Sequence, residues 1–270
     1  MARSGRALLT MAFAAAVGCG GDPDVRHPDW EEHFDRANQA TADGNHDQAI
    51  AIGEAYLKSH PGNADGYMMI ADAAAAAGRA ATGSTRAPRF AQAASHYASV
   101  VELSRNPIRR TLSLVESIEV YSPRGLNQPD NAERVARLLI AEDPADFKNY
   151  GALVNVLKDA RKFDGVVAAF AQAKSAIRDD ADTVASYGGL AHDVVAFTPD
   201  FPRDLGRRLL VDAAALTANA LSVHGNGEQL LNTKGMLLRA QAGVEPDAAR
   251  QRALLEESQR TFADLDRRNK

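Results

Sequence analysis

The sequence predicts an all-α protein, a solenoid of about six stacked helical hairpins with no sheet. Alanine is very frequent, while valine and isoleucine are sparse outside short runs, which favours helices packed closely through small side chains. From Trp30 onward, segments of helical length alternate with Pro, Gly and Asp. No stretch shows a sustained alternation of apolar and polar residues, so we expect no strands.

Composition places the chain among ordinary globular proteins. Its 270 residues are enough for one large domain or two small ones, and 45% of them are hydrophobic. The formal net charge is −4 without any block of Lys or Arg, which argues against a nucleic-acid partner. Cys19 is the single cysteine, so neither an intramolecular disulfide nor a cysteine-based metal cluster can form.

Residues 1–18 have the pattern of a secretory signal. Arg3 and Arg6 precede an apolar run at residues 7–17, and small residues follow it. The apolar run is too short to span a bilayer, which needs roughly 20 residues. Residues 16–19 read AVGC, and this stretch resembles the lipobox of bacterial lipoproteins, in which a small residue precedes an invariant Cys.

The lipobox resemblance implies a lipoprotein-type signal peptide at residues 1–18 and a lipid on Cys19. Membrane contact would then run through this N-terminal lipid only, because two or more acyl chains hold a protein stably on a bilayer. Gly20 stands where an Asp tends to retain Gram-negative lipoproteins at the inner membrane, so we expect the outer membrane, facing the periplasm. We expect residues 19–28 to comprise the lipidated Cys and a flexible tether. A catalytic thiol is disfavoured because Cys19 adjoins a hydrophobic leader rather than a folded pocket with a base.

Residues 29–270 contain an internal repeat. Two segments carry an Ala twelve positions before a Pro: Ala49 and Pro61 in the first, Ala132 and Pro144 in the second. The clearest unit lies at residues 147–173, where apolar residues recur at i, i+3, i+4 and i+7 before a short turn and a second apolar helix. The first helix of this unit carries Tyr150, Leu153, Val154 and Leu157, and the second carries Val166, Phe170 and Ala173.

The other predicted hairpins match the repeat pattern less closely. We expect insertions at residues 79–89 and 198–203, and a final helix that acts as a solvating cap rather than another stacked repeat. The expected helices are residues 66–78 with 90–103, 107–121 with 130–143, 182–197 with 204–221, and 228–243 with 245–266.

These spacings resemble tetratricopeptide (TPR) repeats, which have a period of roughly 34 residues. The resemblance implies a right-handed superhelix whose concave groove is lined by the first helix of each hairpin and binds a protein or peptide. Phe34 and Met68 are apolar where the dicarboxylate-clamp type of this family needs basic residues, so a carboxylate clamp is not expected. Carried over through the repeat register, the groove residues are Phe34, Asn38, Met68, Asp72, Arg109, Glu116, Asn155, Lys158 and His192.

The sequence contains few motifs of the kind that support catalysis or metal binding. His33 lies near Glu31 and Glu32, but the spacing matches no HExxH motif, so we interpret HPDWEEHF as a charged first turn with Trp30 and Phe34 facing inward. No GxSxG or GxGxxG motif occurs. We therefore expect a protein that is not an enzyme, with no catalytic residues, no cofactor and no metal site.

Two further histidine interpretations follow from helical geometry. Adjacent helical residues point about 100° apart, so His192 and Asp193 are not expected to pair. His46, His60, His96 and His224 fall at predicted turns or polar faces, where we expect them to be solvated.

The favoured hypothesis is a lipid-anchored, periplasm-facing scaffold or adaptor that binds a protein partner in the groove of its repeats. The alternative is a transporter-accessory lipoprotein that binds a small apolar ligand in a cavity of the helical stack. Met68, Met69 and the run at residues 73–77 are candidates for lining such a cavity, although simple helix packing explains them better.

Overall fold

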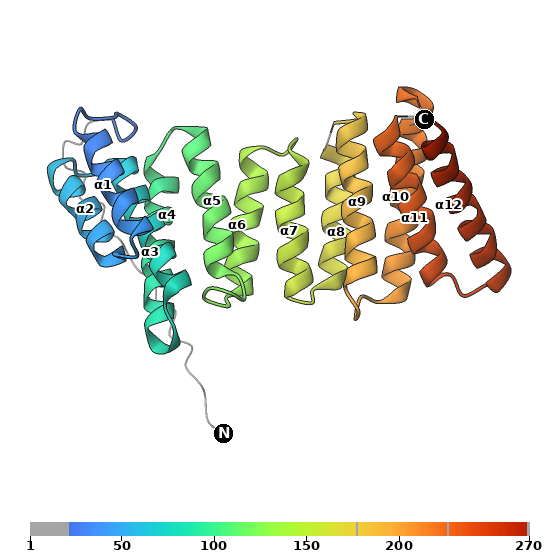
Figure 1. The fold of residues 1–270 in the computed structure, drawn as a ribbon, viewed down its shortest axis with the longest axis horizontal. Helices are drawn as coiled ribbons and strands as arrows, with labels where there is room; N and C mark the ends of the chain where they lie inside the picture. The colour runs from blue at the N-terminus through green and yellow to red at the C-terminus, as the bar shows by residue number, and fades with distance from the viewer. Residues whose placement is uncertain (1–21, 177, 226, 269–270) are drawn as a thin grey trace, which may run out of the picture.

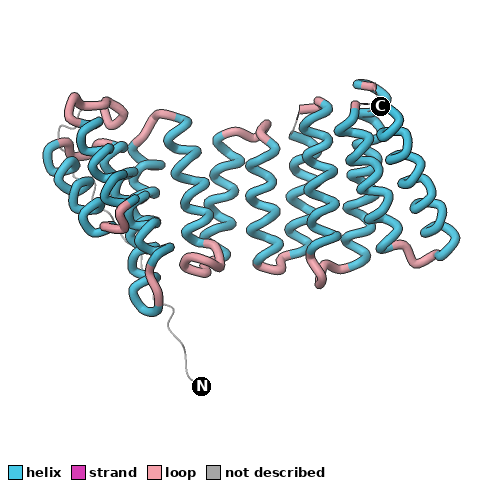
Figure 2. The backbone as a smooth tube through the Cα atoms, in the orientation of Figure 1, coloured by secondary structure: helices cyan, strands magenta, loops and turns pink. Residues whose placement is uncertain are grey.

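A computed structural model describes residues 22–176, 178–225 and 227–268 of the chain. These residues form twelve α-helices and one short 3-10 turn, without a strand, and the helices stand side by side in one long row (Figure 1; Figure 2). The helices are α1 Trp30–Ala42, α2 His46–Ser59, α3 Ala64–Ala80, α4 Arg86–Leu103, α5 Pro107–Tyr121, α6 Pro129–Glu142, α7 Phe147–Asp159, α8 Phe163–Ala176, α9 Ala181–Phe197, α10 Arg203–His224, α11 Glu228–Val244 and α12 Ala248–Arg268, with the 3-10 turn at Gly83–Thr85.

The row is a solenoid of helical hairpins, which confirms the predicted fold class. From α1 to α8, and again from α9 to α12, each helix packs against the next one in the chain. Contacts of α1 with α3, α7 with α9, α8 with α10 and α9 with α11 tie neighbouring hairpins together. The right-handed sense of the superhelix stays a prediction.

Four hairpins begin at the same kind of capped turn. The residue before α3, α5, α7 and α9 is an Asn or Asp whose side chain accepts hydrogen bonds from backbone N–H groups of the first helical turn. These caps satisfy donors that a helix start leaves without partners. The capping residues are Asn63, Asn106, Asp146 and Asp180.

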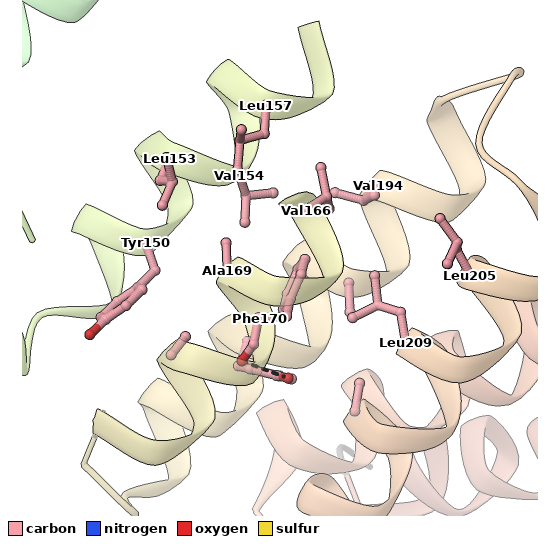
Figure 3. Close-up of a cluster of buried hydrophobic side chains, with 14 of the residues drawn as sticks. Tyr150, Leu153, Val154, Leu157, Val166, Ala169, Phe170, Val194, Leu205 and Leu209 are labelled. Atoms are coloured by element: carbon pink, nitrogen blue, oxygen red, sulfur yellow. Dashed lines mark hydrogen bonds between the residues drawn. The ribbon is translucent and has the colours of Figure 1, made fainter. Parts of the chain in front are cut away.

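The hairpin formed by α7 and α8 has the core that its periodicity predicts (Figure 3). Leu153 and Leu157 of α7 are buried, and Val166 and Phe170 of α8 lie in the same apolar cluster. Tyr187 of α9 joins the cluster, and its hydroxyl donates to the Phe170 carbonyl oxygen at 3.3 Å. The cluster therefore runs without interruption from this hairpin into the next one.

Small residues allow the close helix contacts that the alanine content predicts. A Cβ atom added to Gly188 of α9 would lie 2.4 Å from the Cγ2 atom of Thr233 on α11. The adjacent Gly189 has open space around the same position. The α9–α11 crossing therefore requires a missing side chain at Gly188 and not at Gly189.

The connections between helices are shorter than predicted. Because α3 continues to Ala80 and α4 begins at Arg86, the expected insertion at residues 79–89 shrinks to residues 81–85. The expected insertion at 198–203 shrinks in the same way to residues 198–202. Six of the eleven residues of the first predicted insertion thus extend α3 and α4, whereas only Arg203 of the second belongs to a helix. Ser258 and Thr261 are the buried residues of α12, in keeping with a capping helix.

Residues 22–29, which we name the N-terminal strap, lie against the repeats. The Ala64 amide donates to the Pro23 carbonyl oxygen at 2.9 Å, and the Asn63 side-chain amide donates to the Val25 carbonyl oxygen at 2.8 Å. The flexible tether predicted for residues 19–28 is thus a bound segment from residue 22 onward. Cys19 and the predicted signal peptide lie outside the described residues. Among the helices that the structure describes, none combines the length and apolar character needed to cross a bilayer.

Candidate functional site

The residues predicted to line the groove all come from first helices of hairpins, but they do not form one site. Phe34 is half-buried and stacks on Trp30 with ring centroids 4.6 Å apart, so it belongs to the packing of α1. Asn38 is exposed on the same helix, and Met68 is half-buried on α3. Arg109 belongs to an ion-pair network at the strap, Glu116 and Asn155 line a pocket farther along the row with Lys158 beside it, and Asp72 and His192 belong to neither.

Arg109 is engaged by the protein itself. Its guanidinium lies 2.8 Å from Asp24 of the strap and 2.8 Å from Asp65 of α3, and its side chain is only 12% exposed. Asp24 also accepts hydrogen bonds from the Ser104 hydroxyl and from the amides of Arg105 and Asn106. The strap and α3 thus already pair with the guanidinium of Arg109, and its contact with a partner stays a prediction.

A pocket of about 510 Å³ lies between α5 and α7. Its floor includes Ala132 near the start of α6, and the loop between α5 and α6 closes one end. Most of its surface is apolar, and it is partly open to solvent. The residues that line it are Val115, Glu116, Ile118, Glu119, Tyr121, Ser122, Pro123, Asn127, Pro129, Ala132, Ala152, Asn155, Val156, Asp159 and Ala160.

Two predicted groove residues, Glu116 and Asn155, line this pocket from opposite walls. Lys158, also predicted, donates to the Asn155 side-chain oxygen at 3.2 Å and so stands beside the pocket. The residues predicted from the repeat register thus include one on each wall of the pocket. We name the space enclosed by these walls the α5–α7 pocket.

Local sequence explains the closed end of the pocket. The loop after α5 folds back through hydrogen bonds from the amides of Leu126 and Gln128 to the carbonyl oxygens of Val120 and Tyr121. Asn127 has a φ of 53°, a left-handed conformation that Asn tolerates better than most residues. Pro129 then starts α6, where its missing N–H leaves no hydrogen bond unmade. The result is a short, well-hydrogen-bonded wall.

The pocket rim is acidic. Glu116 and Glu119 come from α5 and Asp159 comes from α7, while no Lys or Arg belongs to the lining. Arg79 lies 3.9 Å from Glu116, a long contact between two exposed side chains that is worth little. Within the described part of the chain, neither Glu119 nor Asp159 forms an ion pair. The pocket thus combines an apolar interior with two acidic groups that are free to pair.

An apolar stripe extends from the pocket along the exposed face of α5. Ile108, Leu112 and Val115 recur at i, i+4 and i+7, and their exposed fractions are 69%, 48% and 46%. This spacing places them on one side of the helix. The opposite side carries the core residues Leu114 and Val120.

Asp72 of α3, another predicted groove residue, lies outside the pocket lining but within electrostatic range of Glu116. The Tyr97 hydroxyl donates to Asp72 Oδ1 at 2.7 Å. Desolvation by the surrounding protein raises the pKa of Asp72 above its usual range, against the opposing effect of this hydrogen bond, and nearby Glu116 adds to the increase. Asp72 therefore extends the acidic character of this face toward α3.

Sequence reasoning missed Val115, Glu119 and Asp159. A signal for Val115 is present in the printed sequence: PIRRTLSLVESIEVY carries more apolar residues than the core face of one helix can use. Glu119 and Asp159 carry no comparable signal, because charged residues on an exposed helix face are common.

The structure corrects the interpretations of His192 and His60. His192 Nδ1 lies 2.9 Å from Asp193 Oδ1, so these adjacent side chains do pair, and His192 is mostly buried rather than open to a partner. His60 Nε2 lies 3.0 Å from Asp29 Oδ1 and its ring stacks on His27 at 3.8 Å, so His60 is packed rather than solvated. His224 is exposed, as expected, and its Nε2 lies 2.9 Å from the Asp179 carbonyl oxygen.

The segment HPDWEEHF forms the strap end and the start of α1. His33 Nδ1 lies 2.8 Å from the Asp29 carbonyl oxygen rather than facing Glu31 or Glu32. No group of three or more His, Cys, Asp or Glu side chains suitable for a metal ion occurs in the described residues. Met69 and most of the alanines at residues 73–77 are buried, and none of them lines the pocket between α5 and α7.

Comparisons with known proteins add little to this geometry. No protein-family model matches the chain, and no curated protein matches it. Among solved structures, the chain is similar to the crystal structure of BtubC (BKLC) from P. vanneervenii, at 16% sequence identity and a TM-score of 0.42. The similarity covers 85% of this chain and 92% of that chain. A likeness this weak carries no argument about function.

Proposed function

We propose that the protein is a lipid-anchored scaffold or adaptor of the bacterial cell envelope, built from TPR-type hairpins, which binds a segment of a protein partner. The observation that carries this proposal is the α5–α7 pocket. Its lining includes Glu116 and Asn155, which the repeat register alone predicts to lie in the groove. A pocket on the first helices is where this class of repeat would bind a partner.

The helix starts support the TPR-type assignment. The first helices α1 and α3 begin at Trp30 and Ala64, and α7 and α9 begin at Phe147 and Ala181, so both pairs are 34 residues apart. This spacing equals the period of a tetratricopeptide repeat. The remaining first helices are spaced more widely.

The test is site-specific photo-cross-linking from the pocket in intact cells. A photoreactive amino acid at Asn155, on the pocket wall, is expected to capture a discrete partner protein. The same amino acid at Val211, which is 49% exposed on α10, serves as the matched control. Equal capture from both positions, or none from Asn155, would contradict binding in the pocket.

The location is tested separately by mass spectrometry of the purified protein. We expect the chain to begin at Cys19 with lipid attached to its sulfur and its amino group. An unmodified Cys19, or cleavage at another position, would exclude the lipid anchor without affecting the proposal about the pocket.

A second candidate function is a transporter-accessory lipoprotein that holds a small apolar ligand. The apolar lining of the α5–α7 pocket supports this alternative. The partly open mouth favours a protein segment, because most of a bound small molecule is normally buried. Native mass spectrometry of the protein purified in detergent would reveal a retained small ligand as a fixed mass increment.

A further inference from the structure

We propose that the α5–α7 pocket selects a partner segment in which a bulky apolar side chain lies next to a lysine or arginine. This inference rests on the proposed function and specifies the chemistry of the partner. It follows from three features of the pocket: its apolar interior, its acidic rim and the apolar stripe that leads into it.

The interior provides the apolar part of the recognition. Ile118, Tyr121 and Val156 contribute apolar surface, and Ala132 and Ala152 leave room between the walls. The volume of about 510 Å³ accommodates a large aliphatic or aromatic side chain. Burying such a side chain contributes affinity in proportion to the apolar area removed from water.

The rim provides the charged part. Glu119 and Asp159 stand on opposite walls, and neither forms an ion pair within the described residues. Lys162, which is close to Asp159 in sequence, pairs instead with Asp130 and Glu133 on α6. A cationic side chain from the partner would therefore meet two carboxylates without displacing an existing ion pair. Complementary charge of this kind sets which partner binds more than how tightly it binds.

The stripe sets the direction and length of the bound segment. From Ile108 to Glu119 the α5 helix rises about 16 Å, which corresponds to roughly five residues of an extended chain. A segment that places its apolar side chain in the pocket can continue along Leu112 toward Ile108, both of which are exposed. A free apolar ligand would not use the stripe or the acids, and a second copy of this chain would need a matching basic segment.

The experiment selects peptides from a random dodecapeptide display library with the full-length protein in detergent. Enriched peptides are expected to share an apolar residue beside Lys or Arg. A synthetic enriched peptide is expected to bind at least tenfold more weakly to Val115→Arg and to the double variant Glu119→Lys/Asp159→Lys. Replacing its basic residue with Glu is expected to weaken binding to a similar extent.

Matched controls separate the pocket from general surface effects. Val211→Arg makes the same substitution at a similarly exposed valine on α10, and Asp212→Asn removes an exposed carboxylate there. Both are expected to leave peptide affinity within twofold of the original protein. Circular dichroism checks folding, and Val115→Ser replaces Val115→Arg if the larger substitution lowers helical content.

The outcomes distinguish the two proposals. Enriched peptides that lack basic residues but still lose affinity in Val115→Arg overturn the charge preference and leave the partner-binding pocket standing. Peptides unaffected by every pocket variant, together with no cross-linking from Asn155, overturn both. Concentration-dependent self-association that Val115→Arg abolishes would identify the occupant as a second copy of the chain and overturn this inference.

Discussion

Asp24 and Arg109 lie 85 positions apart in the sequence, and Arg109 Nη1 lies 2.8 Å from Asp24 Oδ1. Asp65 holds the other side of the same guanidinium, so the strap, α3 and α5 meet at one cation. Isolated exposed ion pairs contribute little, but both of these carboxylates are largely buried. Four donors converge on Asp24, and each loses a partner if the carboxylate is removed.

Asp24→Asn is expected to lower the free energy of unfolding by about 2 kcal/mol, because it weakens charge-assisted hydrogen bonds to partly buried donors. Chemical denaturation measures the change, and hydrogen exchange should locate it at the amides of Arg105 and Asn106. Asp200→Asn is the control, since it breaks an exposed ion pair with Arg161 and should cost less than about 1 kcal/mol. Equal effects of the two variants would contradict a structural role for the strap.

The contribution of Asp24 to the free energy of unfolding should decrease at low pH. Partial burial acts to raise the pKa of Asp24, but hydrogen bonds from Ser104, the Arg105 amide and Arg109 outweigh it and hold the pKa below the ordinary value of 3.8. A carboxyl with a lowered pKa stabilises the fold fully above its unfolded value and loses this contribution as pH falls through its folded value. The stability difference between the original protein and Asp24→Asn should therefore be constant from pH 7 to about pH 5 and shrink only below 3.8.

Alanine substitutions at two adjacent glycines of α9 should differ in their effect on stability, because only one of these glycines contacts α11. Gly188→Ala places a methyl group against Thr233 and is expected to destabilise the protein by about 1–3 kcal/mol. Gly189→Ala has open space and replaces Gly in a helix, so it should be neutral or stabilise by up to about 1 kcal/mol. Thermal unfolding of the two variants gives the comparison, and a loss of stability in Gly189→Ala would contradict it.

The central core is expected to depend on Leu153. Its side chain is fully buried in the cluster shared by α7 and α8, so Leu153→Ala should cost about 2–5 kcal/mol through lost burial and a residual cavity. Leu138 on α6 is 44% exposed, and Leu138→Ala should change stability by about 0.5 kcal/mol or less. Urea denaturation of both variants measures the difference. Similar losses would show that Leu153 does not lie in a tightly packed core.

Local pattern was enough to predict the hairpins but not what joins distant parts of the chain. The spacing of Leu153 and Phe170 within their helices follows from which face must be buried, and that requirement is visible in a single segment. The pairing of Asp24 with Arg109 is not visible in the same way, because it depends on the strap folding back over two hairpins. A short segment rich in Gly, Asp and Pro therefore resembled a tether.

For the pocket, too, local pattern predicted some residues, while others depend on how separate helices are placed. Glu116 and Asn155 followed from their positions on first helices, whereas Val115 and Asp159 depend on how far α5 and α7 stand apart over α6. The connections on either side of α6 set that separation, and no pattern within a single helix encodes it.

The bound strap shortens the flexible connection between the proposed lipid at Cys19 and the helical repeats. Three peptide units separate Cys19 from Asp22, the first described residue, and a fully extended chain of that length reaches roughly 11 Å. A protein attached to the membrane at Cys19 would then have a short connection to the lipid rather than a long flexible tether. Its first hairpins would stay near the lipid surface, and the distance from the membrane at which a partner meets the α5–α7 pocket would be set by the row of helices.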